Sequence, residues 1–230
     1  MIVFDKENPD IINLFIDLFD TLLEESDRGA IIIGATKVEE QLSLYIQSIL
    51  PKSSATYRKK LLKYPGILSS FNSKIELAYA FRLIDKKLYA SLNSLRILRN
   101  KAAHSPTSLS ISDLTDQYEK IFDLGSETQL LIKNQSKELI VKAKFKHLKS
   151  LFEEWKLTDQ QQEEQVKGLL ESGELIENLE KQVPKWELVF GLTILCSFMK
   201  YEKEETLELL GQSDTWFIRN LKSKNKVSNP

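Results

Sequence analysis

DIINLFIDLFDTLLEE, residues 10–25, is the stretch that decides the fold. Its apolar residues recur every three or four positions, at Ile11, Leu14, Phe15, Leu18, Phe19, Leu22 and Leu23. This spacing places them on one face of a helix, because an α-helix completes a turn in about 3.6 residues. Asp10 after Pro9 is a typical helix start. We therefore expect an amphipathic helix whose apolar face other helices must cover.

The following sequence repeats this helical pattern. Apolar residues keep the same period in four further stretches, at about 26–50, 69–84, 86–104 and 111–124. Eight glycines and six prolines are few for 230 residues, whereas strand-rich proteins need more turn residues. The sequence therefore predicts an all-α fold, a multi-helix bundle over residues 10–125 with strand content near zero.

The character of the chain changes near residue 130. A basic stretch, KNQSKELIVKAKFKHLKSLFEEWK at 133–156, is followed by an acidic, glutamine-rich stretch at 158–182. Two more helices are expected at about 184–203 and 204–222, with a flexible tail at 223–230. We therefore divide the chain into a helical domain at 1–130 and a C-terminal region at 131–222, either a helical extension or a small second bundle. The basic and acidic helices should pack against each other or across a dimer.

Composition excludes several classes of protein. The net charge of −1 gives no global attraction to nucleic acid. The single Cys196 excludes an intrachain disulfide and a cysteine-based zinc site, and it suits a cytoplasmic protein. The longest apolar stretch, at 186–199, is too short to cross a membrane and carries Glu187, so we expect a buried helix. We expect no metal, no cofactor and no membrane contact, since phosphate-loop, dinucleotide and metal-ligand motifs are missing.

The stretch LRILRNKAAHSP at 95–106 holds the main candidate site. Arg96, Asn100 and His104 are four residues apart and share one helix face, and Arg99 lies close to it. An imidazole titrates near neutral pH and can act as a general acid or base, while a guanidinium matches phosphate oxygens. His104 and Arg99 could therefore serve RNA cleavage, with Asn100 orienting the imidazole.

A structural interpretation of this cluster is equally coherent. Glu25 and Asp27 in ESDRGA, next to Arg28, could pair with Arg96 or Arg99 and tie helices together. We favour this polar tie over a ligand or partner site, and both over catalysis. A basic segment, YRKKLLK at 57–63, offers possible phosphate contacts through Arg58, Lys59, Lys60 and Lys63. Three tryptophans are expected in the core: Trp155, Trp186 and Trp216.

Three segments resemble the mannitol operon repressor family in order and spacing: ESDRGA at 25–30, SSFNSKIELAYAFRLI at 69–84 and LRILRNKAAHS at 95–105. The likeness covers about residues 11–125 and implies an all-helical protein of bacterial transcriptional regulation. RNKAAH also resembles the Arg-x₄₋₆-His motif of HEPN domains. These are helical bundles, often dimeric, and many are metal-independent RNases of toxin–antitoxin and phage-defence systems. That second likeness implies active-site roles for Arg99, Asn100 and His104.

The leading hypothesis is a cytoplasmic regulatory module that works through protein contacts as a homodimer. The alternative is a HEPN-type endoribonuclease that binds RNA and uses Arg99, Asn100 and His104. The target, the effector and the role of the region after residue 130 remain open at the level of sequence.

Overall fold

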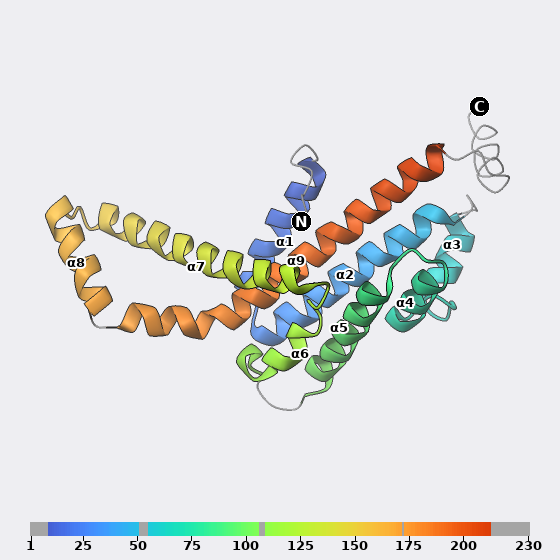
Figure 1. Cartoon of the computed structure of the whole chain (residues 1–230), viewed down its shortest axis with the longest axis horizontal. Helices are drawn as coiled ribbons and strands as arrows, with labels where there is room; N and C mark the ends of the chain where they lie inside the picture. Colours follow the sequence, from blue (N-terminus) through green and yellow to red (C-terminus); the bar gives the residue numbers. More distant parts are fainter. Residues whose placement is uncertain (1–8, 51–54, 106–108, 172, 213–230) are drawn as a thin grey trace.

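The computed structural model describes residues 9–50, 55–105, 109–171 and 173–212, and every regular element in these ranges is helical. The expected all-α multi-helix bundle is confirmed (Figure 1). The elements are α1 (Pro9–Glu24), α2 (Asp27–Ile49), α3 (Ala55–Leu62), α4 (Phe71–Ala80), α5 (Lys86–His104), the 3₁₀ helix η1 (Ile111–Leu114), α6 (Thr115–Glu119), α7 (Ser126–Glu154), α8 (Asp159–Glu171) and α9 (Glu174–Gln212).

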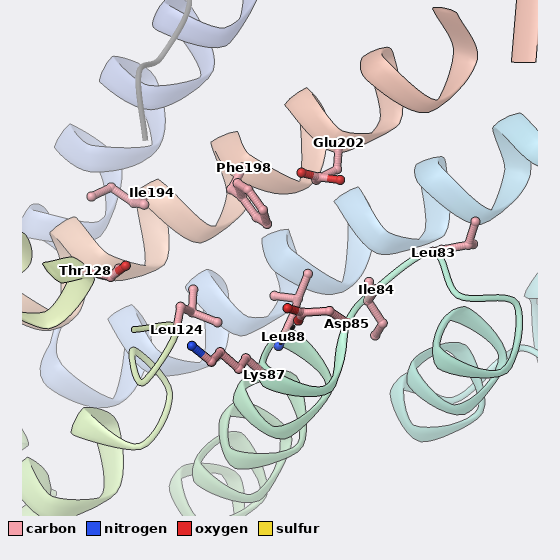
Figure 2. A pocket seen from close by; sticks show the side chains of 10 residues that line it. All are labelled: Leu83, Ile84, Asp85, Lys87, Leu88, Leu124, Thr128, Ile194, Phe198 and Glu202. Atoms are coloured by element: carbon pink, nitrogen blue, oxygen red, sulfur yellow. Dashed lines mark hydrogen bonds between the residues drawn. The ribbon is translucent and has the colours of Figure 1, made fainter. Parts of the chain in front are cut away.

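Short polar side chains fix where three of these helices begin. The first backbone N–H groups of a helix lack partners within it, and a side-chain oxygen just before the helix can accept from them. Ser26 accepts from the N–H of Gly29 at the start of α2. Ser70 does the same at α4, and Asp85 accepts from the N–H of Leu88 at 2.8 Å at α5 (Figure 2). The entries of α2, α4 and α5 are thus defined locally.

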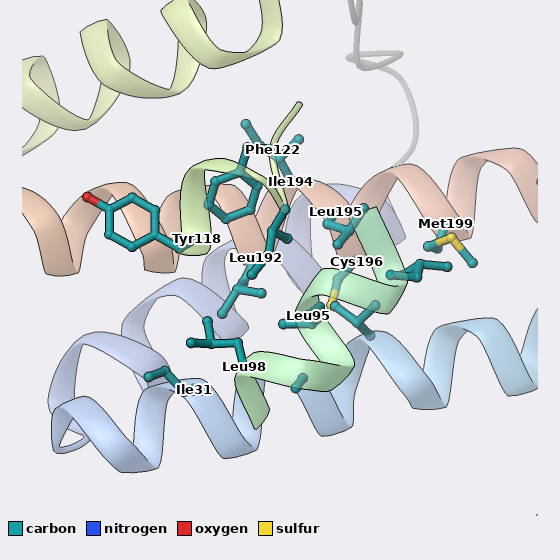
Figure 3. Packing of buried hydrophobic residues seen from close by; sticks show 14 of the residues in the cluster. Ile31, Leu95, Leu98, Tyr118, Phe122, Leu192, Ile194, Leu195, Cys196 and Met199 are labelled. Carbon is teal, nitrogen blue, oxygen red and sulfur yellow. The ribbon is translucent and has the colours of Figure 1, made fainter. Parts of the chain in front are cut away.

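The centre of the core is the apolar stretch 186–199, which lies in α9. This part of α9 packs against α1 and α2, and its buried side chains meet those of α5 and α6 (Figure 3). Leu192, for example, is fully buried. The expected buried helix is therefore present. The described core also draws on residues from both sides of the boundary expected near residue 130.

Close packing at this centre requires a glycine. The ring of Phe122 lies directly over Gly191, so that a Cβ added at Gly191 would lie 2.3 Å from Phe122 Cζ. No real Cβ contact is that short. A side chain at position 191 would therefore push α9 away from the segment that carries Phe122.

One part of the molecule extends away from this core (Figure 1). The second half of α7 runs outward, α8 forms the tip, and the first turns of α9 run back. We call residues 141–183 of the described chain the arm, and the remaining helices the body. Of the two arrangements expected for the C-terminal region, the arm corresponds to a helical extension.

The end of the chain differs from the expectation. The helix α9 is continuous from Glu174 to Gln212, with Pro184 inside it, so the predicted break near residue 203 is wrong. The sequence there, YEKEE, contains strong helix formers and no residue that stops a helix. The predicted tail at 223–230 lies outside the described residues.

The tryptophans also differ from the expectation. Trp155 ends α7 at the tip of the arm and is 57% exposed, so its predicted place in the core is wrong. Trp186 is half-buried, and its ring packs edge-on against Phe19 of α1 with 5.6 Å between ring centroids. Trp216 lies outside the described residues.

Candidate functional site

Arg99 is held by an ion-pair cluster that joins three helices. Its Nη1 lies 2.6 Å from Glu39 Oε2 of α2, and Lys74 Nζ of α4 lies 2.6 Å from Glu39 Oε1. These side chains are largely buried, with 24%, 16% and 9% exposure for Arg99, Glu39 and Lys74. The guanidinium also sits 5.3 Å from the centroid of the Phe71 ring, within the range of a cation–π contact. The cluster therefore ties α2, α4 and α5 together.

His104 and Asn100 lie elsewhere on the same helix. Both are exposed, and His104 is the last residue of α5. Because each residue turns a helix by about 100°, five residues place Arg99 and His104 about 140° apart around the axis. Within one chain, α5 therefore directs the guanidinium towards Glu39 and leaves His104 on another side. The imidazole of His104 has no hydrogen bond or ion pair among the described residues.

The segment at 25–30 makes a different tie from the one expected. Asp27 Oδ2 accepts from the N–H of Ile111 at 2.9 Å, and Arg28 Nη2 donates to the backbone oxygen of Ser105 at 2.7 Å. These bonds fix the start of α2 against the end of α5 and the start of η1. The predicted pairing of Arg99 with Glu25 or Asp27 is wrong, since Arg99 pairs with Glu39.

The remaining members of the predicted cluster have local partners. Arg96 Nε donates to Asn93 Oδ1, one turn earlier, at 3.3 Å. The backbone oxygen of Glu25 accepts from Lys185 Nζ of α9, where that helix enters the body. Arg96 and Glu25 thus take no part in the ion-pair cluster around Arg99.

The basic segment at 57–63 lies mostly on α3. Lys59, Lys60 and Lys63 are exposed and Arg58 is half-buried. No ion pair involves these four cations among the described residues. Arg58, Lys59 and Lys60 lie on α3, and Lys63 follows its last residue.

A pocket of about 330 Å³ lies between the start of α5 and the middle of α9 (Figure 2). Its floor is apolar and includes Leu88, Ile194 and Phe198, while Asp85, Lys87 and Glu202 supply charge. Burial raises the pKa of the Glu202 carboxyl, and the nearby Glu205 and Asp85 act in the same direction. Sequence reasoning missed this pocket. Two of its charged residues, Asp85 and Glu202, are 117 positions apart in the chain, and its charged residues share no motif.

A buried hydrogen bond explains the acid inside the apolar stretch 186–199. Tyr118 Oη donates to Glu187 Oε2 at 3.0 Å, and both side chains are buried. Burial raises the pKa of the Tyr118 phenol, which therefore stays protonated and keeps donating. This bond links α6 to α9 and gives Glu187 a partner.

The arm carries exposed apolar side chains next to a groove. The groove, of about 510 Å³, lies between α7 and α8 and is lined by Phe145, Leu148, Phe152 and Val166. Phe145 is 49% exposed, and Trp155 beyond the groove is more exposed still. Charged side chains surround it: Lys149, Asp159, Glu163 and Lys167. Large apolar groups left beside a groove are typical of a contact surface.

Chemistry that needs a metal or a reactive thiol finds little support in the described ranges. No group of three or more His, Cys, Asp or Glu side chains there is arranged to hold a metal ion. Cys196 is buried, and burial raises the pKa of its thiol, which suppresses the nucleophilic thiolate. In the same part of the chain, no helix combines the length and the apolarity needed to cross a bilayer.

Comparison with known proteins gave no match to a family model, to a curated protein or to a solved structure.

Proposed function

We propose that this chain is a cytoplasmic regulatory module of the mannitol operon repressor type, which acts through contacts with other proteins. The observation that carries this proposal is the arm. It leaves Phe145 exposed at an apolar groove and Trp155 exposed at the end of α7, and its described residues do not belong to the core cluster of the body. The resemblance of residues 11–125 to mannitol operon repressors supplies the regulatory role.

The state of Arg99 favours regulation over RNA cleavage. An RNase would need the guanidinium at the phosphate, close to His104. In this chain the guanidinium is paired with Glu39 and packed over Phe71. Releasing it would leave the partly buried Glu39 with Lys74 alone and would loosen three helices.

One observation keeps the HEPN-type RNase as a second candidate. His104 and Asn100 are one helical turn apart, exposed and accessible to a large substrate. A second copy of the chain could bring another His104 to the same phosphate. Arg99 would then contribute by holding α5 in place rather than by touching RNA.

Two variants separate these functions. Arg99→Ala should lower the free energy of unfolding by about 1–3 kcal/mol, because it removes one partner of a largely buried ion pair. His104→Ala should leave the stability unchanged, because the imidazole is exposed at the end of α5. Purified wild-type protein should not cleave RNA in the presence of a metal chelator. Cleavage that disappears in the stable His104→Ala variant would establish the RNase instead.

The regulatory role is tested in cells that overproduce the chain. Transcript levels should change at a limited set of genes with the wild type and with His104→Ala. Phe145→Ser on the arm should abolish these changes, whereas Ile97→Ser, at a still more exposed apolar residue on α5 of the body, should not. Identical transcript profiles for the wild type and an empty control would contradict the proposal.

A further inference from the structure

We propose that the arm is a self-association surface, on which the basic helix of one copy lies against the acidic helix of a second copy. This inference deepens the proposed function, because it names a second copy of the chain as the partner of the arm. It rests on the proposed function only in treating the arm as a surface for protein contacts.

Charge is divided between the two helices of the arm. Before its last two residues, Glu153 and Glu154, the outward part of α7 carries only lysines among its acidic and basic residues other than His147, whereas α8 carries mainly acids. The exposed lysines of this part of α7 are Lys142, Lys146 and Lys149, and the exposed acids of α8 are Asp159, Glu163, Glu164 and Glu171.

These opposite charges are not neutralised against each other within the chain. The ion pairs of this region join residues of the same helix, such as Lys142 with Glu138 and Lys167 with Glu171. Among the described residues, Lys146, Lys149, Glu163 and Glu164 form no ion pair. The basic and acidic faces therefore remain available to a partner.

Charges of both signs line the one groove between α7 and α8, with Lys149 and Lys167 beside Asp159 and Glu163, which makes that surface complementary to itself. In a two-fold dimer, a contact between residue i and residue j is repeated between j and i. The basic face of each arm would therefore meet the acidic face of the other arm, so that the dimer contains this contact two times. A nucleic acid fits less well, because α8 would repel its phosphates.

The apolar groove supplies the centre of such an interface. Phe145, Phe152 and Val166 line it, and Lys149 and Glu163 stand at its edge. An apolar centre with a charged rim is the usual anatomy of a protein interface. Because the arm extends away from the body, two arms can overlap while the two bodies stay apart (Figure 1).

Charge exchange between copies tests this arrangement. One full-length variant carries Lys146→Glu and Lys149→Glu, and the other carries Glu163→Lys and Glu164→Lys. Sedimentation velocity should show that the wild type dimerises and that added salt weakens the dimer. Each variant alone should self-associate about tenfold more weakly or worse, because two-fold symmetry repeats every repulsive contact. An equimolar mixture of the two variants should restore dimers, which native mass spectrometry will identify as heterodimers.

A control variant changes the same charges outside the arm. Lys59→Glu with Lys60→Glu alters two exposed lysines of α3 and should dimerise like the wild type. Circular dichroism establishes that every variant is folded.

Three results would overturn the inference: a wild type that stays monomeric, variants that still self-associate, or a mixture without heterodimers. Loss of binding to a double-stranded RNA probe in the Lys146→Glu, Lys149→Glu variant, without any self-association, would assign the basic helix to nucleic acid. A monomeric chain that still changes transcript levels would refute the dimer and leave the regulatory function standing. If the two variants form heterodimers but the chain cleaves RNA through His104, the dimer would stand and the regulatory function would be refuted.

Discussion

The body and the arm are built from the same kind of helix, and even share α9, yet they differ in what covers their apolar side chains. In the body, α9 packs against α1, α2 and α7, and its apolar residues from Leu188 to Met199 are almost all buried. In the arm, the side chain of Ile176 in the same helix is half exposed to solvent. Helical sequence alone thus does not produce a core. Stability should be concentrated in the body, while the arm is left with surface for binding.

The largest expected effect comes from truncating one leucine of the body. Leu192→Ala removes a fully buried side chain from the centre of the core and should lower the free energy of unfolding by about 2–5 kcal/mol. Ile176→Ala, in the same helix but in the arm, should cost no more than about 0.5 kcal/mol. Urea unfolding followed by circular dichroism measures both. Equal losses would mean that body and arm share stability evenly.

Two glycines provide the opposite change, the addition of a methyl group. Gly191→Ala places a Cβ against the ring of Phe122 and should cost about 3 kcal/mol, the upper end for overpacking. Gly168→Ala in α8 of the arm meets nothing within 4 Å and should be neutral or stabilising by up to about 1 kcal/mol, because alanine favours helix. Thermal unfolding of the two variants gives the comparison. A tolerated Gly191→Ala would show that α9 and the segment that carries Phe122 can separate freely.

A buried hydrogen bond should matter more than an exposed one of the same chemistry. Tyr118→Phe removes the donor to the buried Glu187 and should cost about 1–2 kcal/mol. Tyr89→Phe removes a similar bond, from Tyr89 Oη to the exposed Glu76 at 2.9 Å, and should cost about 0.5 kcal/mol or less. Both losses are read from urea midpoints. If the two variants lose the same amount, burial does not strengthen the Tyr118 bond.

The smallest expected effect concerns pH and Glu202. Burial raises the pKa of this carboxyl in the folded chain, so the folded state binds the proton more tightly than the unfolded state. The resulting stability is complete below the unfolded pKa and is lost as the pH rises through the folded pKa. Glu202→Gln should therefore raise the melting temperature at neutral pH by about 1–2 °C, and less at pH 4. Glu180→Gln on the exposed arm is the control and should change neither value.

Much of the body could be predicted from local sequence. The apolar period at 10–25 gives α1, and Ser26, Ser70 and Asp85 give the starts of α2, α4 and α5, because capping acts over three residues. Local sequence also favours an unbroken helix after residue 200, where helix formers continue.

The candidate site was harder to predict, because its contacts are long-range. Glu39 pairs with residues 35 and 60 positions away, and in the sequence it looks like an ordinary surface acid in the run KVEEQ. The motif at 99–104 suggests one cluster, but the rotation of the helix per residue places Arg99 and His104 on different sides of α5. For the arm, the sequence gives the charges of its two helices. Its outward course and the exposure of Trp155 follow from packing that no local pattern encodes.

Because residues 186–199 form the centre of the core, the newly made chain can complete its core only after α9 has been synthesised. A ribosome releases α1, α2 and α5 long before α9, although α9 covers their apolar faces. During that interval the unfinished chain displays surface that binds chaperones and is open to proteases. Any interruption of translation between α5 and α9 therefore yields a fragment that lacks the centre of its core, and the cell should remove it rather than accumulate it.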